Sequence, residues 1–383
     1  MEGKLEVWGG TTEHGRACYY VSVGDQSILL DCGINIVTGE MPEIDYDKLT
    51  KVDYILLSHA HEDHSKGLIE LIKLGYRKKV IMSEETGRQL YELYSSILSN
   101  CAHDFKYVDQ MADYLEWFKL SEHIELCYGA SGHMYGAIWF LIKIDGKVIF
   151  YSGDYNHQVQ ILPFHSPEKA MGSDVIDFAI IDCANGLEEH KSKKEAHEFG
   201  KRNLFIVNRF SKAIEVIVGL SEQYPNHSFY YDEALYDEIV RQVKSRKRRL
   251  HLCDEQRHRH SESFRLEWFK EADFIFLEQD LLNSERQFAV ASFLQNNGHQ
   301  IYLTSKANFL KYQETFFSDR ILYLSVKAHQ GVKGVINLLN VLKVKKAILC
   351  HLDGDENIKS VKMLQSKGFD NVYFCEVRAS IAF

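Results

Sequence analysis

Four side chains that bind divalent metals lie within six consecutive positions of the sequence. They are His59, His61, Asp63 and His64, in the segment VDYILLSHAHEDH. Imidazole and carboxylate groups are the ligands that zinc and similar ions prefer, and close spacing lets one turn of loop present several of them to one ion. The chain has only 18 histidines in 383 residues. The cluster therefore predicts a metal site rather than a solvent-exposed polar loop.

Further acidic and histidine residues share one placement, after an apolar run typical of a buried strand. They are Asp31 after ILL, His133 in YGASGH, Asp154 in VIFYSGD, Asp182 after FAII, His329 in ILYLSVKAH and His351 after AILC. Polar residues at the carboxyl ends of buried strands emerge at one edge of a sheet, where open α/β folds bind ligands. Each one alone is more often an ordinary hydrogen-bonding residue, but the set predicts convergence. Other histidines, such as His14 and His123, lack this placement and are expected at the surface or in hydrogen bonds.

Apolar runs that predict strands alternate with stretches that predict helices. Strands are predicted at 28–30, 54–57, 148–151, 178–181, 321–324 and 347–349, and helices at 84–98 and 334–342. This alternation predicts a layered α/β architecture. Residues 185–319 carry their own predicted strands, at 204–207, 274–277 and 301–304, and separate two groups of site residues. We therefore expect an insertion there, with residues 1–184 and 320–383 forming the other domain.

Composition restricts the class of protein. The 45% hydrophobic content is ordinary for a folded protein. The net charge of −9 does not indicate a surface that binds nucleic acid over most of its area. One basic run departs from this acidic balance, at Arg241, Lys244 and residues 246–249. It predicts a solvated helix face, with a phosphate-binding surface as the alternative. No apolar run is long enough for a membrane span and no secretory pattern opens the chain, so we expect a cytoplasmic protein with reduced cysteines and no membrane partner.

The motifs as a set resemble the metallo-β-lactamase superfamily. HAHEDH with Asp31 upstream, GHMYG with His133 and SGD with Asp154 resemble its first four motifs. Asp182, His329 and His351 sit where the β-CASP branch, which includes RNase J and the pre-mRNA 3′-end-processing endonuclease, carries three further motifs. The resemblance implies an α/β fold, a four-layer αβ/βα sandwich into which a β-CASP α/β cap is inserted.

The same resemblance implies a centre of two divalent metal ions, zinc with manganese as the alternative. One ion would be held by His59, His61 and His133, the other by Asp63, His64 and His351, with Asp154 between them and Asp31 orienting ligands from outside the cage. The residues with an expected catalytic role are Asp63, Asp182 and His329. Two ions at one site lower the pKa of water and neutralise the charge of a phosphodiester.

The resemblance favours RNA as the substrate, because RNA-cleaving members have a histidine at the position of His351. Arg209 and Lys212 are expected to contact substrate phosphates, and a homodimer is the habit of the family. Gln330 and Gly331 depart from the residues that relatives carry after His329. Three alternatives stay open: hydrolysis of a small ester, amide, lactone or nucleotide, cleavage of DNA, and a metal-bound interaction protein without activity.

Overall fold

The computed structural model describes residues 1–172, 174–187, 199, 201–208, 210–231, 233–244, 272–278, 292, 295–304, 309, 321–324 and 326–383. The chain divides into two compact units. The first comprises Met1–Val159, Pro163–Glu189 and Ala328–Phe383, and the second comprises Gln160–Leu162 and His190–Lys327. The second unit thus begins near the predicted start of the insertion, residue 185, and runs on to residue 327, past its predicted end at 319.

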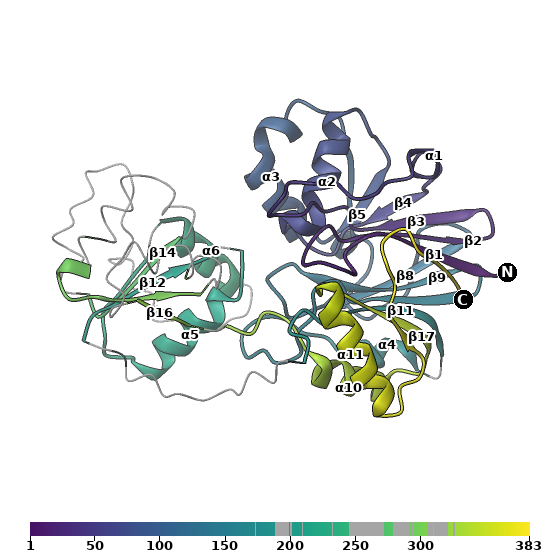
Figure 1. The fold of residues 1–383 in the computed structure, drawn as a ribbon. Helices are drawn as coiled ribbons and strands as arrows, with labels where there is room; N and C mark the ends of the chain where they lie inside the picture. The colour runs from purple at the N-terminus through teal and green to yellow at the C-terminus, as the bar shows by residue number, and fades with distance from the viewer. Residues whose placement is uncertain are drawn as a thin grey trace. The chain divides into compact units, whose positions relative to one another are not determined.

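One sheet of the first unit is built from seven strands in the order β19-β1-β2-β3-β4-β5-β6. The strands are β1 (Gly3–Gly9), β2 (Cys18–Val23), β3 (Gln26–Leu30), β4 (Tyr54–Leu56), β5 (Lys79–Met82), β6 (Asp104–Tyr107) and β19 (Ser380–Ala382). The pairs from β19 to β3 are antiparallel, and those from β3 to β6 are parallel. The two ends of the chain therefore meet at one edge of this sheet, as Figure 1 shows.

The other sheet also has seven strands, in the order β18-β17-β11-β10-β9-β8-β7. They are β7 (Phe118–Lys119), β8 (Ile124–Ala130), β9 (Ile138–Ile144), β10 (Lys147–Tyr151), β11 (Ile176–Asp182), β17 (Val344–Cys350) and β18 (Val372–Tyr373). Strands β10, β11, β17 and β18 run parallel, while β7 to β10 form an antiparallel series. The segments before and after the second unit thus pair directly, through β11 and β17.

The apolar residues of each strand alternate between two cores, because successive side chains point to opposite faces. In β3, Ile28 and Leu30 pack between the two sheets, whereas Leu29 packs under the helices. Helices α2 (Glu62–Lys73) and α3 (Glu84–Leu98) cover one sheet, and α10 (Val332–Val341) and α11 (Gly354–Ser366) cover the other (Figure 1). The short helices α1 (Tyr46–Leu49), α4 (Glu168–Met171) and the 3-10 turn η1 (Val108–Gln110) lie in connections. The four-layer αβ/βα sandwich is confirmed.

The second unit contains a five-stranded parallel sheet in the order β13-β14-β12-β15-β16. Its elements are β12 (Asn203–Val207), α5 (Ala213–Gln223), β13 (Phe229–Tyr231), α6 (Glu233–Lys244), β14 (Phe274–Glu278), β15 (Gln300–Leu303) and β16 (Ile321–Tyr323). Strand β16 pairs with β15, so the strand predicted at 321–324 belongs to this sheet and not to the returning domain. Within the described residues, no helix combines the length and apolarity that a membrane crossing requires.

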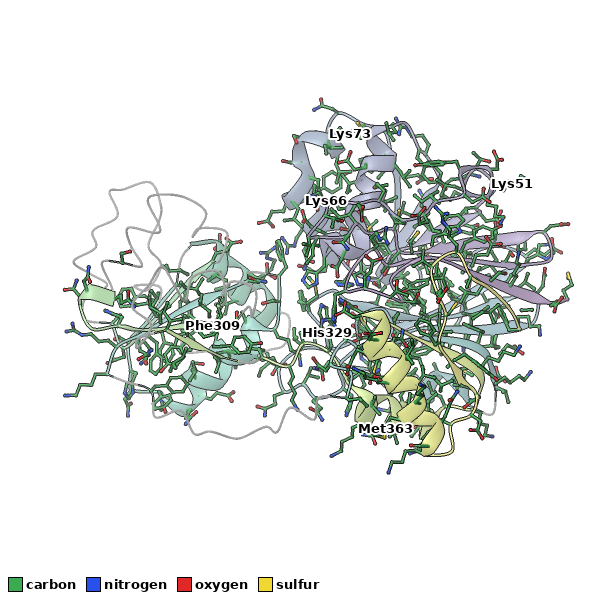
Figure 2. The ribbon with its side chains drawn as sticks, in the orientation of Figure 1. Lys51, Lys66, Lys73, Phe309, His329 and Met363 are labelled. Carbon is green, nitrogen blue, oxygen red and sulfur yellow. The ribbon has the colours of Figure 1, made fainter. Side chains whose placement is uncertain are left out.

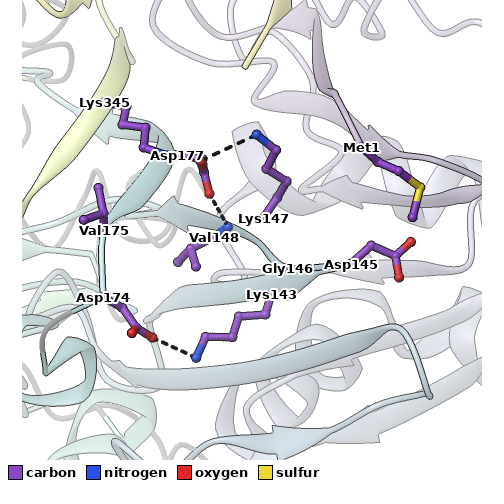
Figure 3. Close-up of a pocket in the computed structure, with 10 residues that line it drawn as sticks. All are labelled: Met1, Lys143, Asp145, Gly146, Lys147, Val148, Asp174, Val175, Asp177 and Lys345. Atoms are coloured by element: carbon purple, nitrogen blue, oxygen red, sulfur yellow. Dashed lines mark hydrogen bonds and ion pairs between the residues drawn. The ribbon is translucent and has the colours of Figure 1, made fainter.

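A depression of about 620 Å³ lies on the first unit beside the turn between β9 and β10 (Figure 3). Its lysines are paired with its aspartates: Lys143 lies 2.9 Å from Asp174, and Lys345 lies 2.8 Å from Asp177. Asp177 also accepts a hydrogen bond from the backbone N–H of Val148 at 2.9 Å. With its charges neutralised in this way, the depression carries no feature of a catalytic site.

Candidate metal centre

The predicted ligands gather at one edge of the two sheets of the first unit. Asp31 follows β3, the segment from His59 to His64 follows β4 and enters α2, and His133 follows β8. Asp154 follows β10 and His351 follows β17, while Asp182 is the last residue of β11. Since these strands run in the same direction within each sheet, their carboxyl ends present residues far apart in sequence to one place.

The loops at these strand ends have unusual backbone conformations. Asp31 and His351 have φ angles of +55° and +66°, in the left-handed region that residues with a side chain rarely adopt. Gly33 lies so close to α2 that a Cβ atom there would stand 1.6 Å from the carbonyl oxygen of Asp63. The loop that carries Asp31 therefore packs tightly against the start of α2, which carries Asp63 and His64.

The first cluster joins three imidazoles and one carboxylate. The Nδ1 atom of His61 lies 3.1 Å from Nε2 of His59 and 3.1 Å from Nε2 of His133. Asp154 Oδ2 lies 3.4 Å from Nε2 of each of these last two histidines. A tetrahedral zinc ion with ligand bonds of about 2.0–2.1 Å separates its ligand atoms by about 3.3 Å. The donor set and its spacing therefore fit such an ion.

The second cluster joins Asp63, His64 and His351, and a third possible set of ligands consists of Asp154, Asp182, His329 and His351. The Nε2 atom of His64 lies 3.1 Å from Asp154 Oδ1 and 3.8 Å from Asp63 Oδ2. His351 contacts both acids, through Nδ1 to Asp154 at 2.9 Å and Nε2 to Asp63 at 3.4 Å. The Nε2 atom of His64 is buried, and its contact with Asp154 lacks hydrogen-bond geometry. Because Nδ1 is taken by Asp31, Nε2 is the nitrogen of His64 that could bind a metal ion.

The outer nitrogens of the predicted ligands are fixed by hydrogen bonds. His59 Nδ1 lies 3.0 Å from Ser58 Oγ, His133 Nδ1 donates to the carbonyl of Ala328 at 3.0 Å, and His64 Nδ1 donates to Asp31 at 2.6 Å. Each contact leaves Nε2 directed at the clusters. Partners of this kind set the tautomer and orientation of histidines that bind metals.

Asp31 is completely buried and accepts hydrogen bonds from four donors. Its Oδ1 accepts from the backbone N–H of Ser58 at 2.7 Å, and its Oδ2 accepts from Ser58 Oγ at 2.6 Å and the Tyr151 hydroxyl at 2.5 Å, besides His64. A charged acceptor with this many donors is rigid. The roles of Ser58 and Tyr151 were not predicted from the sequence, because their spacing does not indicate a contact with Asp31.

His329 lies where the chain returns to the first unit ahead of α10 (Figure 2). Its Nδ1 atom donates to Asp182 Oδ2 at 3.1 Å. Asp182 also accepts from the backbone N–H groups of Tyr155 and Ala184, each at 3.0 Å, so its carboxylate is held in place. Asp182 therefore orients His329. Asn185 donates to the carbonyl of His329 at 2.6 Å, and Gln330 donates to the carbonyl of Asp182 at 3.0 Å, which fixes the backbone on both sides.

Charge and burial shift the protonation of the centre. Burial works to lower the pKa of His351, but the carboxylates of Asp154 and Asp63 outweigh it and raise that pKa to about 9. The same balance holds the pKa of His64 well above its ordinary value. Burial works to raise the pKa of Asp154, yet the surrounding imidazoles, led by His64, keep it well below the ordinary range. For His133 burial prevails and lowers the pKa. The centre thus holds ionised carboxylates that attract cations.

The predicted substrate contacts lie outside these clusters. Arg209 and residues 246–249 of the basic run fall outside the described residues. Lys212 precedes α5 in the second unit and is buried, and burial lowers its pKa to about 8. Its contact with a substrate phosphate stays a prediction.

Comparison with known proteins agrees with this geometry. Residues 26–184 match the model of a family described as the beta-lactamase superfamily domain. An RNase J-like protein of Methanocaldococcus jannaschii is 31% identical over 192 residues, which are 48% of this chain and 42% of that protein. The cleavage and polyadenylation specificity factor subunit 3-I of Arabidopsis thaliana is 26% identical over 263 residues, 60% of this chain and 36% of that protein. The matches thus span less than half the length of these relatives.

A crystal structure of an Enterococcus faecalis protein of unknown function has the same fold, with a TM-score of 0.66, 12% identity and full coverage of both chains. The fold, the strand-end cluster and the match of residues 26–184 make this chain similar to proteins of the beta-lactamase superfamily. The curated relatives that it matches are of the β-CASP branch.

Proposed function

We propose that this protein is a dinuclear metal-dependent phosphodiesterase that cleaves RNA. The observation that carries the proposal is Asp154, a buried carboxylate that lies 3.4 Å from the imidazoles of His59 and His133 and 3.1 and 2.9 Å from those of His64 and His351. Named relatives support RNA as the substrate, since several are endoribonucleases, such as those of Neurospora crassa and Gibberella zeae, at 26% and 28% identity. The net charge of −9 favours the alternative of a small uncharged or singly charged substrate.

In this proposal His59, His61 and His133 would hold one divalent ion, Asp63, His64 and His351 would hold the other, and Asp154 would help to hold both. When bound, such ions lower the pKa of water and neutralise phosphodiester charge. Zinc fits the nitrogen-rich first cluster, and manganese is the alternative. The resemblance also gives Asp63 a catalytic role. In the structure Asp63 contacts His64 and His351, so it positions these two side chains.

His329 is the candidate for handling the proton of the leaving oxygen. Its Nδ1 atom is fixed by Asp182, while no hydrogen bond among the described residues involves Nε2, and 19% of the side chain is exposed. Imidazole is the side chain that most often donates or accepts a proton in catalysis. Asp182 acts through it, by fixing the ring and its tautomer.

The decisive experiment offers end-labelled RNA, single-stranded DNA and bis(4-nitrophenyl) phosphate to the purified full chain, first treated with chelator and then supplied with zinc or manganese. We expect metal-dependent cleavage of RNA, which His64→Ala abolishes while the protein stays folded. His123→Ala is the matched control, because His123 is a half-exposed histidine paired with Asp145. Hydrolysis of the small ester with intact RNA would replace the proposal with the small-substrate alternative.

Two properties of the whole protein also remain proposals. We infer a cytoplasmic location from the sequence, and a homodimer from the habit of the family. Light scattering coupled to gel filtration tests the dimer, and a mass equal to one 44.4 kDa chain would reject it.

A further inference from the structure

The loop between β1 and β2 carries a histidine that the sequence alone leaves at the surface. The His14 ring lies edge-on to the ring of His351, with 5.5 Å between centroids. Its side chain is nevertheless 49% exposed. His14 therefore stands at the rim of the candidate centre, accessible to solvent and in contact with a predicted ligand.

The backbone of this loop is fixed to the centre from two sides. On one side, the N–H groups of His351 and Gly354 donate to the carbonyls of Gly10 and Thr12, at 2.7 and 3.1 Å. On the other side, the N–H of Ala17 donates to the carbonyl of Asp63 at 2.9 Å. The backbone that carries His14 is therefore held at a fixed distance from His351 and Asp63.

His14 is the outermost member of a row of imidazoles. Its neighbour His351 lies 4.7 Å from His329 between ring centroids, and His329 lies 4.6 Å from His133. Along the row, the exposed fraction of the side chain is 49% at His14, 12% at His351, 19% at His329 and 3% at His133. His14 is therefore the imidazole of the row that is most accessible from solvent.

We propose that His14 binds the substrate, by a hydrogen bond from its imidazole to a phosphate that neighbours the one cleaved. This inference rests on the proposed ribonuclease function. His14 belongs to none of the three groups of possible metal ligands found among the described residues, so we assign it to the substrate and not to a metal ion. A polynucleotide has phosphates on both sides of the scissile bond, whereas a small phosphodiester has only one. His14 thus distinguishes RNA from small esters.

The test compares the wild type and His14→Phe on an RNA oligonucleotide and on bis(4-nitrophenyl) phosphate. Phenylalanine keeps the ring against His351 but cannot bind phosphate. We expect kcat/KM on RNA to fall by about tenfold to a hundredfold, the usual effect of a hydrogen bond to a charged group, mainly through a higher KM. Turnover of the small ester and zinc content should change less than twofold. His14→Gln keeps a donor and should recover most of the loss on RNA.

Two controls separate substrate binding from structure. His123→Phe replaces a histidine of nearly equal exposure, 48%, that also faces a carboxylate, and it should leave both activities unchanged. Asp353→Asn removes the acid that lies 3.9 Å from His14 Nε2. If Asp353→Asn reproduces the loss seen in His14→Phe, the histidine merely pairs with Asp353 and the inference is wrong.

The remaining outcomes are also decisive. An equal loss on both substrates, or a loss of zinc in His14→Phe, would mean that the ring supports His351 and does not bind substrate. Unchanged cleavage of RNA by His14→Phe would overturn this inference and leave the ribonuclease proposal standing. A wild type that hydrolyses only the small ester would overturn both.

Discussion

At the scale of single residues, Asp31 and its hydrogen-bond donors fix the orientation of the ligand His64. The hydroxyl of Tyr151 is one of its four donors, and the pKa of this buried phenol is raised well above the ordinary range, first by burial and then by the charge of Asp31. The hydroxyl is therefore a permanent donor. Tyr151→Phe should leave the fold intact but loosen Asp31 and, through it, His64.

We expect Tyr151→Phe to weaken zinc binding by up to about tenfold, less than the roughly tenfold to hundredfold loss that follows removal of a direct partner of a metal ligand, because Tyr151 acts through Asp31. Calorimetric titration of chelator-treated protein with zinc measures it. Tyr128→Phe is the matched control, because Tyr128 is another buried tyrosine whose hydroxyl donates to one acceptor, the carbonyl of Ala112. Equal zinc affinity in the two variants would show that Tyr151 has no part in positioning.

Protonation of single imidazoles sets the pH dependence of the metal-free protein. The pKa of His351 is raised to about 9 from an ordinary value of 6.5, and that of His64 is raised as well. A pKa that is higher in the folded state stabilises it fully below the unfolded value, and this contribution disappears as the pH rises through the folded value. The free energy of unfolding should therefore fall between about pH 6.5 and pH 9.

Thermal unfolding of chelator-treated protein across this range measures the effect. Zinc competes with protons for the same nitrogens, so zinc affinity should rise as the stability of the metal-free protein falls. A melting temperature that stays constant or increases from pH 6.5 to pH 9 would contradict the charge balance described for His351.

At the scale of elements, helix α2 holds the metal motif in place because it packs directly on the loop after β3. Gly33 and Gly67 permit this approach: a Cβ atom on Gly67 would lie 2.7 Å from the carbonyl oxygen of Gly33. Gly33→Ala would push the first turn of α2 away from Asp31. We expect a loss of about 1–3 kcal/mol in the free energy of unfolding, typical of overpacking, together with weaker zinc binding.

Gly354→Ala provides the control for this helix experiment. Gly354 begins α11, and a Cβ atom there would meet Thr12 at an ordinary distance of 3.7 Å. Chemical denaturation of both variants compares them. A Gly33→Ala protein as stable as Gly354→Ala would show that the loop and α2 can move apart freely.

Within the second unit, the first turn of α5 fixes the segment Gln160–Leu162. The carboxylate of Glu215 accepts hydrogen bonds from the N–H groups of Gln160, Ile161 and Leu162, at distances of 2.8 to 3.2 Å. Glu215→Ala would leave these groups without that acceptor. Amide hydrogen exchange at Ile161 and Leu162 should become at least tenfold faster, whereas the exposed Glu222→Ala on the same helix should change nothing.

Elements were the most predictable level of this structure. The helix expected at 84–98 is α3, and the strand ends expected to carry Asp154 and His351 do so, because period and apolar runs are local properties. The allocation of β16 was not predictable, since an apolar run does not say which sheet it joins. Contacts between residues far apart in sequence could not be predicted either. Examples are the hydrogen bond from Tyr151 to Asp31 and the ring contact of His14 with His351.

At the scale of the whole molecule, all the predicted metal ligands belong to the first unit. Strands β11 and β17, which flank the second unit in sequence, pair in register from Ile176 with Val344 to Asp182 with Cys350. The first unit therefore contains all strands of this sheet and all predicted metal ligands. The second unit contributes no described residue to either cluster.

Replacing residues 190–327 with a short flexible linker should thus give a folded protein that still binds two zinc ions. The chain before and after the removed segment is joined by a hydrogen bond from the backbone N–H of Asn185 to the carbonyl of Gln330. Metal analysis and calorimetry of the shortened protein measure binding, with His64→Ala in the same background as the control. We expect cleavage of RNA to be lost and hydrolysis of bis(4-nitrophenyl) phosphate to remain, since a small ester needs only the ions and His329. A shortened protein that folds but binds no zinc would show that the second unit completes the cage, which contradicts the ligand set proposed for the first.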